Sequence, residues 1–307
     1  MTDPAPAPVP RALPLAALAA LRPKQWTKNG LLIAALVFSA RDGVSNLTRV
    51  DDWLLFIGAF TSFCLLSSTG YVYNDLRDAE ADRAHPKKRF RPIAAGELTT
   101  TGAWVLMGLC FTGSMAVAAL VGVPFVICAL LYFATTLSYS TVFKHYVILD
   151  VMFLSACYLW RAVAGAVAID VPISPWLLLC TAFLALFLGF NKRRGEIMLL
   201  DGRKSGTRKA LDHYSPAMLQ EFQAITTSGT IISYALYTVL GSPTPWLLLT
   251  LPYALYGIFR YIYLVDQRGE GAAPDETLLK DVPILLTVAL YVATAVAVIV
   301  FAPHTGP

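Results

Sequence analysis

The amino-acid sequence predicts an all-α membrane protein that crosses the bilayer many times. Of its 307 residues, 56% are hydrophobic and only 14% are charged, whereas about a quarter of the residues in soluble domains are charged. The mean hydropathy of the chain is +0.59. Several apolar runs approach the roughly 20 residues that a helix needs to cross the hydrocarbon core of a bilayer. We therefore expect a polytopic bundle of transmembrane helices.

Nine segments are candidates for spanning helices. They cover residues 26–41, 53–76, 99–121, 123–143, 147–170, 175–191, 217–240, 246–265 and 282–302. The first candidate is short, and glycine and proline predict tight turns at Gly122-Val123-Pro124 and at Gly241-Ser242-Pro243. We expect one catalytic domain over residues 22–302. A Pro/Ala-rich N-terminal tail over residues 1–21, without the features of a signal peptide, is expected to be disordered, and residues 303–307 form a short C-terminal tail.

Basic residues are distributed unequally between the two sides that nine alternating helices would define. Lysines and arginines gather before the first span and after the second, fourth, sixth and eighth, whereas the opposite side has only Arg41 and Arg49. Basic loops tend to remain in the cytoplasm. We therefore expect a protein of the inner (plasma) membrane, with its N-terminus and basic loops in the cytoplasm and its C-terminus outside.

The densest group of acidic residues follows the second span, in the segment NDLRDAEAD at residues 74–82. Asp75, Asp78 and Asp82 lie close to the i, i+4 and i+8 positions of a helix, which would place them on one face together with Asn74. Two such carboxylates can bind Mg²⁺ and leave coordination positions for phosphate oxygens. The alternative is a solvated helix end with ordinary surface charges, although such a group is unusual in a chain so poor in charge.

A basic segment follows these acids directly. His85-Pro86 interrupts the helix, and we expect the next loop to bring Lys87, Arg89 or Arg91 to a phosphate group. Arginine suits bidentate contacts with phosphate, and lysine acts as a point charge. For each of these side chains, contact with anionic lipid headgroups is the alternative.

Three further groups of polar residues are candidates for substrate binding. Lys24 and Lys28 are expected to share a helix face at the start of the first span, beside Trp26, which also fits an interfacial anchor. The sixth span ends with NKRRGE at residues 191–196, which is either a second polar wall or a topology signal. Arg161 lies inside the fifth span, where a charge is costly and usually functional, and we expect it to contact an anionic headgroup.

These motifs resemble those of the UbiA superfamily of intramembrane prenyltransferases. The first motif of that family, NDxxDxxxD, is matched by residues 74–82. The segment RPIAAGEL at 91–98 resembles the basic sequence that follows it, and residues 137–168 resemble the fourth and fifth helices. The resemblance covers about residues 22 to 300 and implies a bundle of nine transmembrane helices around a central polar cavity. It also implies Mg²⁺ as cofactor, with Mn²⁺ as the alternative.

One departure from the family pattern narrows the expected function. Many members carry a second acidic pair, DxxxD, on the sixth helix, where this chain has NKRRGE, with Lys192 four residues before Glu196. This segment and KQWTKN at 24–29 resemble the branch of decaprenyl-phosphate phosphoribosyltransferases. That branch implies transfer of 5-phosphoribosyl from 5-phosphoribosyl 1-diphosphate to decaprenyl (polyprenyl) phosphate, with release of pyrophosphate, in the synthesis of cell-wall arabinan precursors. Extra bases in place of an acid suit a donor and an acceptor that both carry phosphate.

We therefore expect Asn74, Asp78 and Asp82 to bind the metal, with Asp75 as a further catalytic residue. The expected substrate-binding residues are Lys24, Lys28, Lys87, Arg89, Arg91, Arg161, Lys192, Arg193, Arg194 and Glu196. Two other functions also fit the pattern: an aromatic polyprenyltransferase that uses prenyl diphosphate, and a non-enzymatic transporter of anionic lipids. The expected partners are the two substrates and membrane lipids, without nucleic acid, and homo-oligomerisation is left open.

Overall fold

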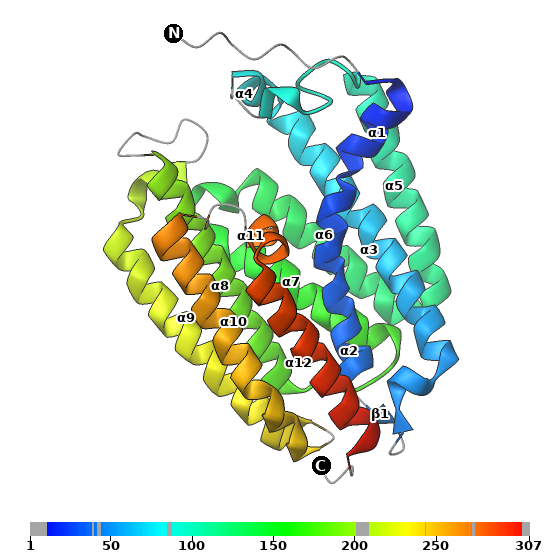
Figure 1. Ribbon diagram of the computed structural model, residues 1–307. Helices are drawn as coiled ribbons and strands as arrows, with labels where there is room; N and C mark the ends of the chain where they lie inside the picture. Colours follow the sequence, from blue (N-terminus) through cyan, green and yellow to red (C-terminus); the bar gives the residue numbers. More distant parts are fainter. Residues whose placement is uncertain are drawn as a thin grey trace. The chain divides into compact units, whose positions relative to one another are not determined.

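The computed structural model describes residues 11–38, 40–41, 44–84, 88–200, 209–242, 244–269, 271 and 274–302. Almost all of these residues are helical (Figure 1). The chain forms two compact units, one of Met1–Gly30 with Gly58–Ala129 and one of Leu31–Ile57 with Leu130–Pro307. The boundary falls within three helices, the 3₁₀ helix η1 (Pro23–Leu32), α3 (Val50–Arg77) and α6 (Val123–Thr141).

The first unit contains α1 (Leu13–Leu21), α4 (Ala79–Ala84) and α5 (Thr100–Val121), together with most of α3. Thr99 caps α5 by accepting a hydrogen bond from the backbone of Gly102, and α5 ends at Gly122, whose φ of 144° favours glycine. Ser62 of α3 and Ser114 of α5, both fully buried, donate hydrogen bonds to each other's carbonyl oxygens. These small residues let the two helices approach closely.

The second unit contains most of the remaining helices. They are α2 (Ile33–Phe38), α7 (Leu149–Ala168), α8 (Pro175–Leu200), α9 (Pro216–Leu236), α10 (Leu251–Arg268), α11 (Pro274–Lys280) and α12 (Val282–Phe301). Helices α8 and α9 run side by side, as do α10 and α12 (Figure 1). The α2 and α3 helices are joined by a two-stranded antiparallel ribbon, β1 (Ala40–Arg41) with β2 (Val44–Ser45), in which Ala40 pairs with Ser45.

Two glycines allow the helices of this unit to pack closely. A Cβ atom on Gly229 of α9 would lie 2.6 Å from the ring of Phe183 on α8. A Cβ atom on Gly189 of α8 would lie 2.6 Å from the side chain of Val151 on α7. Association of helices in lipid depends on such close packing rather than on the hydrophobic effect.

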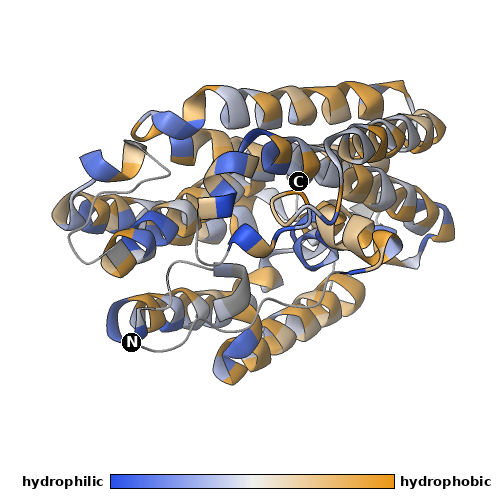
Figure 2. Ribbon diagram, turned by 90° about the horizontal axis from the view of Figure 1, so that it is seen from above, coloured by the Kyte–Doolittle hydropathy of each residue, from blue (hydrophilic) through white to orange (hydrophobic). Residues whose placement is uncertain are grey.

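Seven helices in the described part of the chain are long and apolar enough to cross a membrane. They are Val50–Arg77, Thr100–Val121, Val123–Thr141, Leu149–Ala168, Pro175–Leu199, Pro245–Arg268 and Val282–Phe301. Hydrophobic residues dominate the long helices (Figure 2), and large apolar side chains such as Leu109, Leu120 and Phe301 are exposed, as expected of surfaces that contact lipid. The predicted all-helical membrane class is thus confirmed.

The other two predicted spans are helical but are not among the helices that are long and apolar enough to cross a membrane. The segment predicted at 26–41 is a 3₁₀ helix, η1 (Pro23–Leu32), followed by the short α2, because its first half consists largely of polar residues. The segment predicted at 217–240 corresponds to α9, which contains Gln223 and several threonine and serine residues. The predicted turn at 122–124 coincides with the junction of α5 and α6, and Pro243 of the second predicted turn lies outside the described residues.

Candidate functional site

The acidic motif is placed by a helical backbone that continues beyond the end of α3. The amide of Asp78 donates to the carbonyl of Asn74 at 3.0 Å, and the amide of Asp82 donates to the carbonyl of Asp78 at 2.8 Å. Residues joined by such bonds lie one helical turn apart on the same face. Asn74, Asp78 and Asp82 therefore form one column, in which Asn74 and Asp78 are half-buried and Asp82 is buried.

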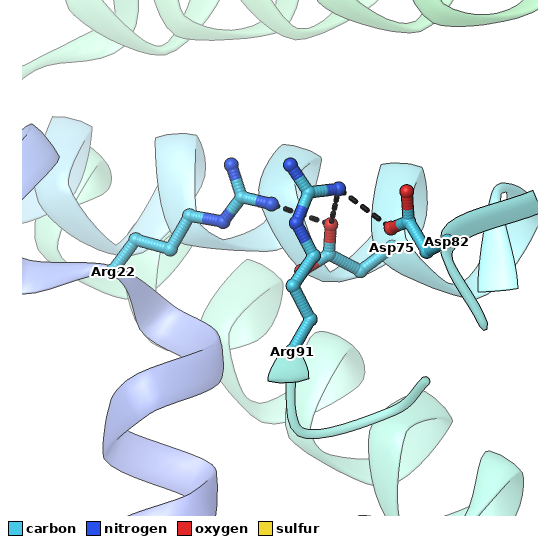
Figure 3. A network of polar contacts seen from close by, with 4 residues as sticks. All are labelled: Arg22, Asp75, Asp82 and Arg91. Carbon is cyan, nitrogen blue, oxygen red and sulfur yellow. Dashed lines mark hydrogen bonds and ion pairs between the residues drawn. The ribbon is translucent and has the colours of Figure 1, made fainter. Parts of the chain in front are cut away.

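Asp75 and Asp82 form an ion-pair cluster with Arg22 and Arg91 (Figure 3). Oδ1 of Asp75 accepts hydrogen bonds from Nη2 of Arg22 at 2.5 Å and from Nη1 of Arg91 at 3.0 Å. The same Nη1 atom of Arg91 donates to Oδ2 of Asp82 at 2.6 Å. Both carboxylate residues are only 2% exposed, so these guanidinium groups supply the charge compensation that buried carboxylates need.

Arg22 is a site residue that the sequence analysis did not identify as a substrate-binding candidate. It follows the last turn of α1, with φ of 54° and ψ of 60°, and its amide bonds back to the carbonyl of Ala19. Its guanidinium group also lies 5.2 Å from the centre of the Tyr71 ring. The left-handed backbone is uncommon for a residue other than glycine, and here it turns the chain so that Arg22 reaches Asp75. The only local signal is Arg-Pro after an apolar helix, which predicts a helix end but no partner.

Arg91 is positioned by a loop that is held by buried apolar residues. Ile93 and Leu98 pack against Ala20, Val72 and Ala103. The amide of Arg91 donates to the carbonyl of Lys88 at 2.9 Å, and its carbonyl accepts from Ala95 at 2.8 Å. The loop backbone is therefore fixed at Arg91 itself, and the 25% exposed side chain extends from it to the two carboxylates.

The other bases predicted after the acidic motif have different positions. Arg89 is exposed, and its guanidinium group stacks 4.7 Å from the centre of the Phe90 ring. Lys87 lies outside the described residues. Of the two predicted phosphate contacts of this loop that the structure describes, Arg91 is the one that lies at the acidic residues.

The N-terminal candidates lie on η1, which is attached to α3. Trp26 donates from Nε1 to Oγ of Ser68 at 3.0 Å, and buried Asn29 donates to Oγ of Ser67 at 3.4 Å. Trp26 is thus hydrogen-bonded to α3 in its own unit, a contact that the alternative of an interfacial anchor did not predict. In a 3₁₀ helix, residues three apart are in line and residues four apart point about 120° apart. The expectation that Lys24 and Lys28 share one face is therefore wrong, and Lys24 is exposed while Lys28 is half-buried.

In the second unit, Arg193 is the centre of a buried network. Its side chain is 0% exposed, with Nε 2.6 Å from Oδ2 of Asp150 and Nη1 2.5 Å from Oε2 of Glu196. The hydroxyl of Tyr214 donates to Oδ1 of Asp150 and accepts from the amide of Ile148, each at 2.7 Å. Burial raises the pKa of the Tyr214 hydroxyl, and its hydrogen bond to Asp150 raises it further.

Two of the three consecutive bases of α8, Arg193 and Arg194, therefore have different partners. Arg194 donates to Oε1 of Gln223 on α9 at 2.7 Å and to Oδ1 of Asp266 on α10 at 2.6 Å. Lys192 is half-buried. Successive residues of an α-helix point about 100° apart, which is why these side chains do not form the single wall that their sequence suggested.

Arg161 is buried within the spanning helix α7, as the sequence predicted. It is 4% exposed and donates to the carbonyl of Cys157 at 3.0 Å and to the hydroxyl of Tyr132 at 2.9 Å. Its guanidinium group lies 4.8 Å and 5.4 Å from the ring centres of Tyr132 and Tyr158. Because α7 rises about 1.5 Å per residue, Arg161 lies roughly 16 Å along the helix from Asp150.

The chemistry of the acidic column fits a hard divalent cation that binds together with phosphate. Among the described residues, no group of three or more histidine, cysteine, aspartate or glutamate side chains could hold a metal ion by itself. The column of Asn74, Asp78 and Asp82 instead provides two carboxylates and one amide. Mg²⁺ commonly uses one or two carboxylates and completes its shell with water and substrate phosphates.

These features define an all-helical, multi-pass membrane protein with an aspartate–arginine cluster at the end of a spanning helix. The family model described as the UbiA prenyltransferase family matches residues 31–279, and the chain belongs to this family. The predicted superfamily is thus confirmed.

Curated relatives cover most of the chain. A decaprenyl-phosphate phosphoribosyltransferase of Corynebacterium glutamicum is 37% identical in an alignment of 290 residues that covers 89% of this chain and 83% of the relative. A protein of the same name from Mycolicibacterium smegmatis is 33% identical in an alignment of 303 residues that covers 95% of each chain.

Solved structures of the family have the same fold. The structure of a UbiA homolog from Archaeoglobus fulgidus bound to GPP and Mg²⁺ superposes with a TM-score of 0.70 at 21% identity, over 92% of this chain and 99% of that one. A UbiA homolog from Aeropyrum pernix K1 gives a TM-score of 0.62 at 15% identity, over 94% and 98% of the two chains. At these identities, the similarity shows the fold alone.

Proposed function

We propose that this protein is an Mg²⁺-dependent decaprenyl-phosphate phosphoribosyltransferase, which transfers the 5-phosphoribosyl group of 5-phosphoribosyl 1-diphosphate to decaprenyl phosphate. Relatives of that name match nearly the whole chain at 33–37% identity. The observation that carries the proposal at the level of the site is the ion-pair cluster, where carboxylates suited to a cation and guanidinium groups suited to phosphate share the end of α3. A diphosphate donor requires both kinds of group.

The donor diphosphate is bound in the first unit. Asn74, Asp78 and Asp82 are the ligands for Mg²⁺, which when bound neutralises charge on the diphosphate oxygens. Arg91 and Arg22 provide guanidinium groups at the same helix end, where arginine can make bidentate contacts with phosphate. The remaining candidates for donor phosphates are Lys24, Lys28, Lys87 and Arg89.

The reaction is a substitution at C1 of the ribose. An oxygen of decaprenyl phosphate forms a bond to C1, the bond from C1 to the diphosphate oxygen breaks, and its electron pair leaves with pyrophosphate. The attacking phosphate is already anionic near pH 7, so no protein group has to remove a proton. An in-line displacement inverts the configuration at C1. The protein contributes orientation of both substrates and stabilisation of the charge on the leaving group.

Residues of the second unit divide into two groups in this proposal. Lys192 and Arg161 remain candidates for contacts with anionic groups of the substrates. Arg193 and Arg194 hold the end of α8 through their ion pairs with Asp150, Glu196 and Asp266, and so act by positioning their neighbours.

The proposed topology has nine crossings, with η1 and α2 as the first and α9 as the seventh, around a central polar cavity. The distribution of basic residues favours an orientation with the N-terminus and the ion-pair cluster on the cytoplasmic side and the C-terminus outside. This orientation suits a donor that is soluble and an acceptor that is dissolved in the membrane.

The test is turnover by the purified full-length protein in detergent. With labelled 5-phosphoribosyl 1-diphosphate, decaprenyl phosphate and Mg²⁺, we expect release of pyrophosphate and a labelled lipid. Chelation of the metal or Asp78→Ala should lower the rate by at least about a hundredfold, as expected for loss of several kcal/mol of transition-state stabilisation. Glu80→Ala is the matched control, because Glu80 belongs to the same acidic segment but is exposed on α4.

Two results would contradict the proposal. Transfer from a prenyl diphosphate to an aromatic acid, without activity on the phosphoribosyl donor, would make the protein an aromatic polyprenyltransferase. Movement of an anionic lipid across vesicles without any release of pyrophosphate would make it a transporter.

A further inference from the structure

Arg91 is bound to the same carboxylate that a metal ion at the acidic column requires. Its Nη1 atom lies 2.6 Å from Oδ2 of Asp82 and 3.0 Å from Oδ1 of Asp75. Both carboxylates are almost completely buried, so solvent contributes little to screening their charge. A cation that binds Asp82 would lie beside this guanidinium group, and like charges at such short separations repel strongly in a partly buried site.

Two guanidinium groups already place positive charge beside the carboxylates that a cation would need, at 2.5 Å and 3.0 Å from Asp75 and at 2.6 Å from Asp82. A diphosphate would add several negative charges and would also offer arginine the bidentate contacts that it favours.

We infer that Arg91 competes with the divalent cation for Asp82, and that a diphosphate relieves this competition by taking over the guanidinium group. The loop backbone need not move, because it is fixed by buried Ile93 and Leu98 and by the hydrogen bonds on either side of Arg91. Rotation of one partly exposed side chain is sufficient. Asp75 keeps Arg22 beside the site throughout.

The consequence is that cation and diphosphate bind cooperatively. Each must raise the affinity for the other by the same factor, since coupling between two ligands is reciprocal. A metal ion alone binds weakly, and the donor arrives as the partner that completes the site. This inference rests on the proposed function, because it assumes that the acidic column binds a cation with a diphosphate.

The test uses Mn²⁺ as the probe ion and the full-length protein in detergent. Loss of the free Mn²⁺ signal in electron paramagnetic resonance measures binding of the metal alone. We expect Arg91→Gln to tighten this binding about tenfold, within the range of ordinary coupling energies. The control is Arg83→Gln, which removes an equal charge one residue from Asp82 at an exposed side chain that, within the described part of the chain, contacts neither carboxylate.

A second measurement addresses the coupling itself. Equilibrium dialysis with labelled inorganic pyrophosphate, with and without Mn²⁺ and corrected for their complex in solution, should show binding at least about tenfold tighter with the metal. In Arg91→Gln, the ratio of the pyrophosphate affinities measured with and without Mn²⁺ should fall towards one. Arg91→Lys keeps the charge but places it on a shorter, strongly hydrated ammonium group, and it should tighten binding of the metal alone by about threefold. This variant carries the test if Arg91→Gln does not fold.

Two outcomes would overturn the inference while leaving the proposed function intact. In one, Mn²⁺ and pyrophosphate bind to the wild-type protein, but both Arg91 variants bind the metal alone with the same affinity as the wild type. In the other, Arg83→Gln tightens metal binding as much as Arg91→Gln does, so that net charge rather than the ion pair is responsible. Absence of Mn²⁺ binding to the wild type, even with pyrophosphate, would refute the metal site of the proposed function as well.

Discussion

Replacing Gly165 of α7 with alanine places a methyl group against the backbone at the end of η1. A Cβ atom at this position would lie 2.2 Å from the carbonyl oxygen, 2.9 Å from the carbonyl carbon and 3.0 Å from the Cα atom of Leu32. Three backbone atoms are involved, so no rotation of a side chain can relieve the contact. To reach the 3.4 Å of an ordinary contact, the oxygen has to move by about 1.2 Å.

The expected cost follows from two opposing effects. Alanine in place of glycine inside a helix contributes roughly 1 kcal/mol of stability through backbone entropy. Overpacking of a tight interface costs about 1–3 kcal/mol when side chains can adjust, and a contact with backbone atoms belongs at or above the upper end of that range. We therefore expect a net loss of about 2 kcal/mol in the free energy of unfolding.

The assay is thermal unfolding of the two purified variants, Gly165→Ala and Gly257→Ala, in the same detergent. Gly257 lies inside α10 of the same unit, and a Cβ atom there would meet nothing within 4 Å. The control should be as stable as the wild type or more stable, whereas Gly165→Ala should unfold at a clearly lower temperature. Equal melting temperatures for the two variants would show that the approach of α7 to Leu32 is not as close as the structure has it.

Three further predictions concern individual polar contacts. Asp75→Asn removes the charge that pairs with Arg22 and Arg91 and should lower the melting temperature, since a charge-assisted hydrogen bond contributes about 1.5–3 kcal/mol. It should also lower kcat/KM for the proposed phosphoribosyl donor roughly tenfold, and an unchanged kcat/KM would contradict this role. Tyr214→Phe leaves the amide of Ile148 and a carboxylate oxygen of Asp150 without their partner, and should cost about 1–3 kcal/mol of stability. The control is Tyr146→Phe, at an exposed tyrosine. Equal stability of the two variants would exclude this hydrogen-bond network. Arg260 holds the pKa of Asp281 below its ordinary value of 3.8, so the stability from this pair is complete above pH 3.8 and is lost as the pH falls through the depressed pKa. Asp281→Asn should abolish that part of the acid-induced loss of stability. An identical acid transition in the variant and the wild type would refute this prediction.

Features that depend on neighbouring residues could be predicted from the sequence. Hydropathy identified the membrane class, and the spacing of Asp75, Asp78 and Asp82, with Asn74, predicted a shared helix face. The backbone hydrogen bonds place Asn74, Asp78 and Asp82 in one column. The first predicted span was less successful, because apolar content predicts a crossing without distinguishing the 3₁₀ helix η1 from an α-helix. Because η1 is a 3₁₀ helix, Lys24 and Lys28 point in different directions, whereas an α-helix would have placed them on one face.

The sequence by itself determined that this is a helical membrane protein with a column of oxygen-bearing side chains at the end of a spanning helix, since both properties follow from residues within a few turns of one another. Only the tertiary structure decided which charges compensate which. Arg22 pairs with a carboxylate 53 residues away, Arg91 joins Asp75 to Asp82, and Arg193 is enclosed with Asp150. The physical reason is that a buried charge takes its partner from whichever elements pack beside it, and that choice depends on backbone direction and burial rather than on local spacing.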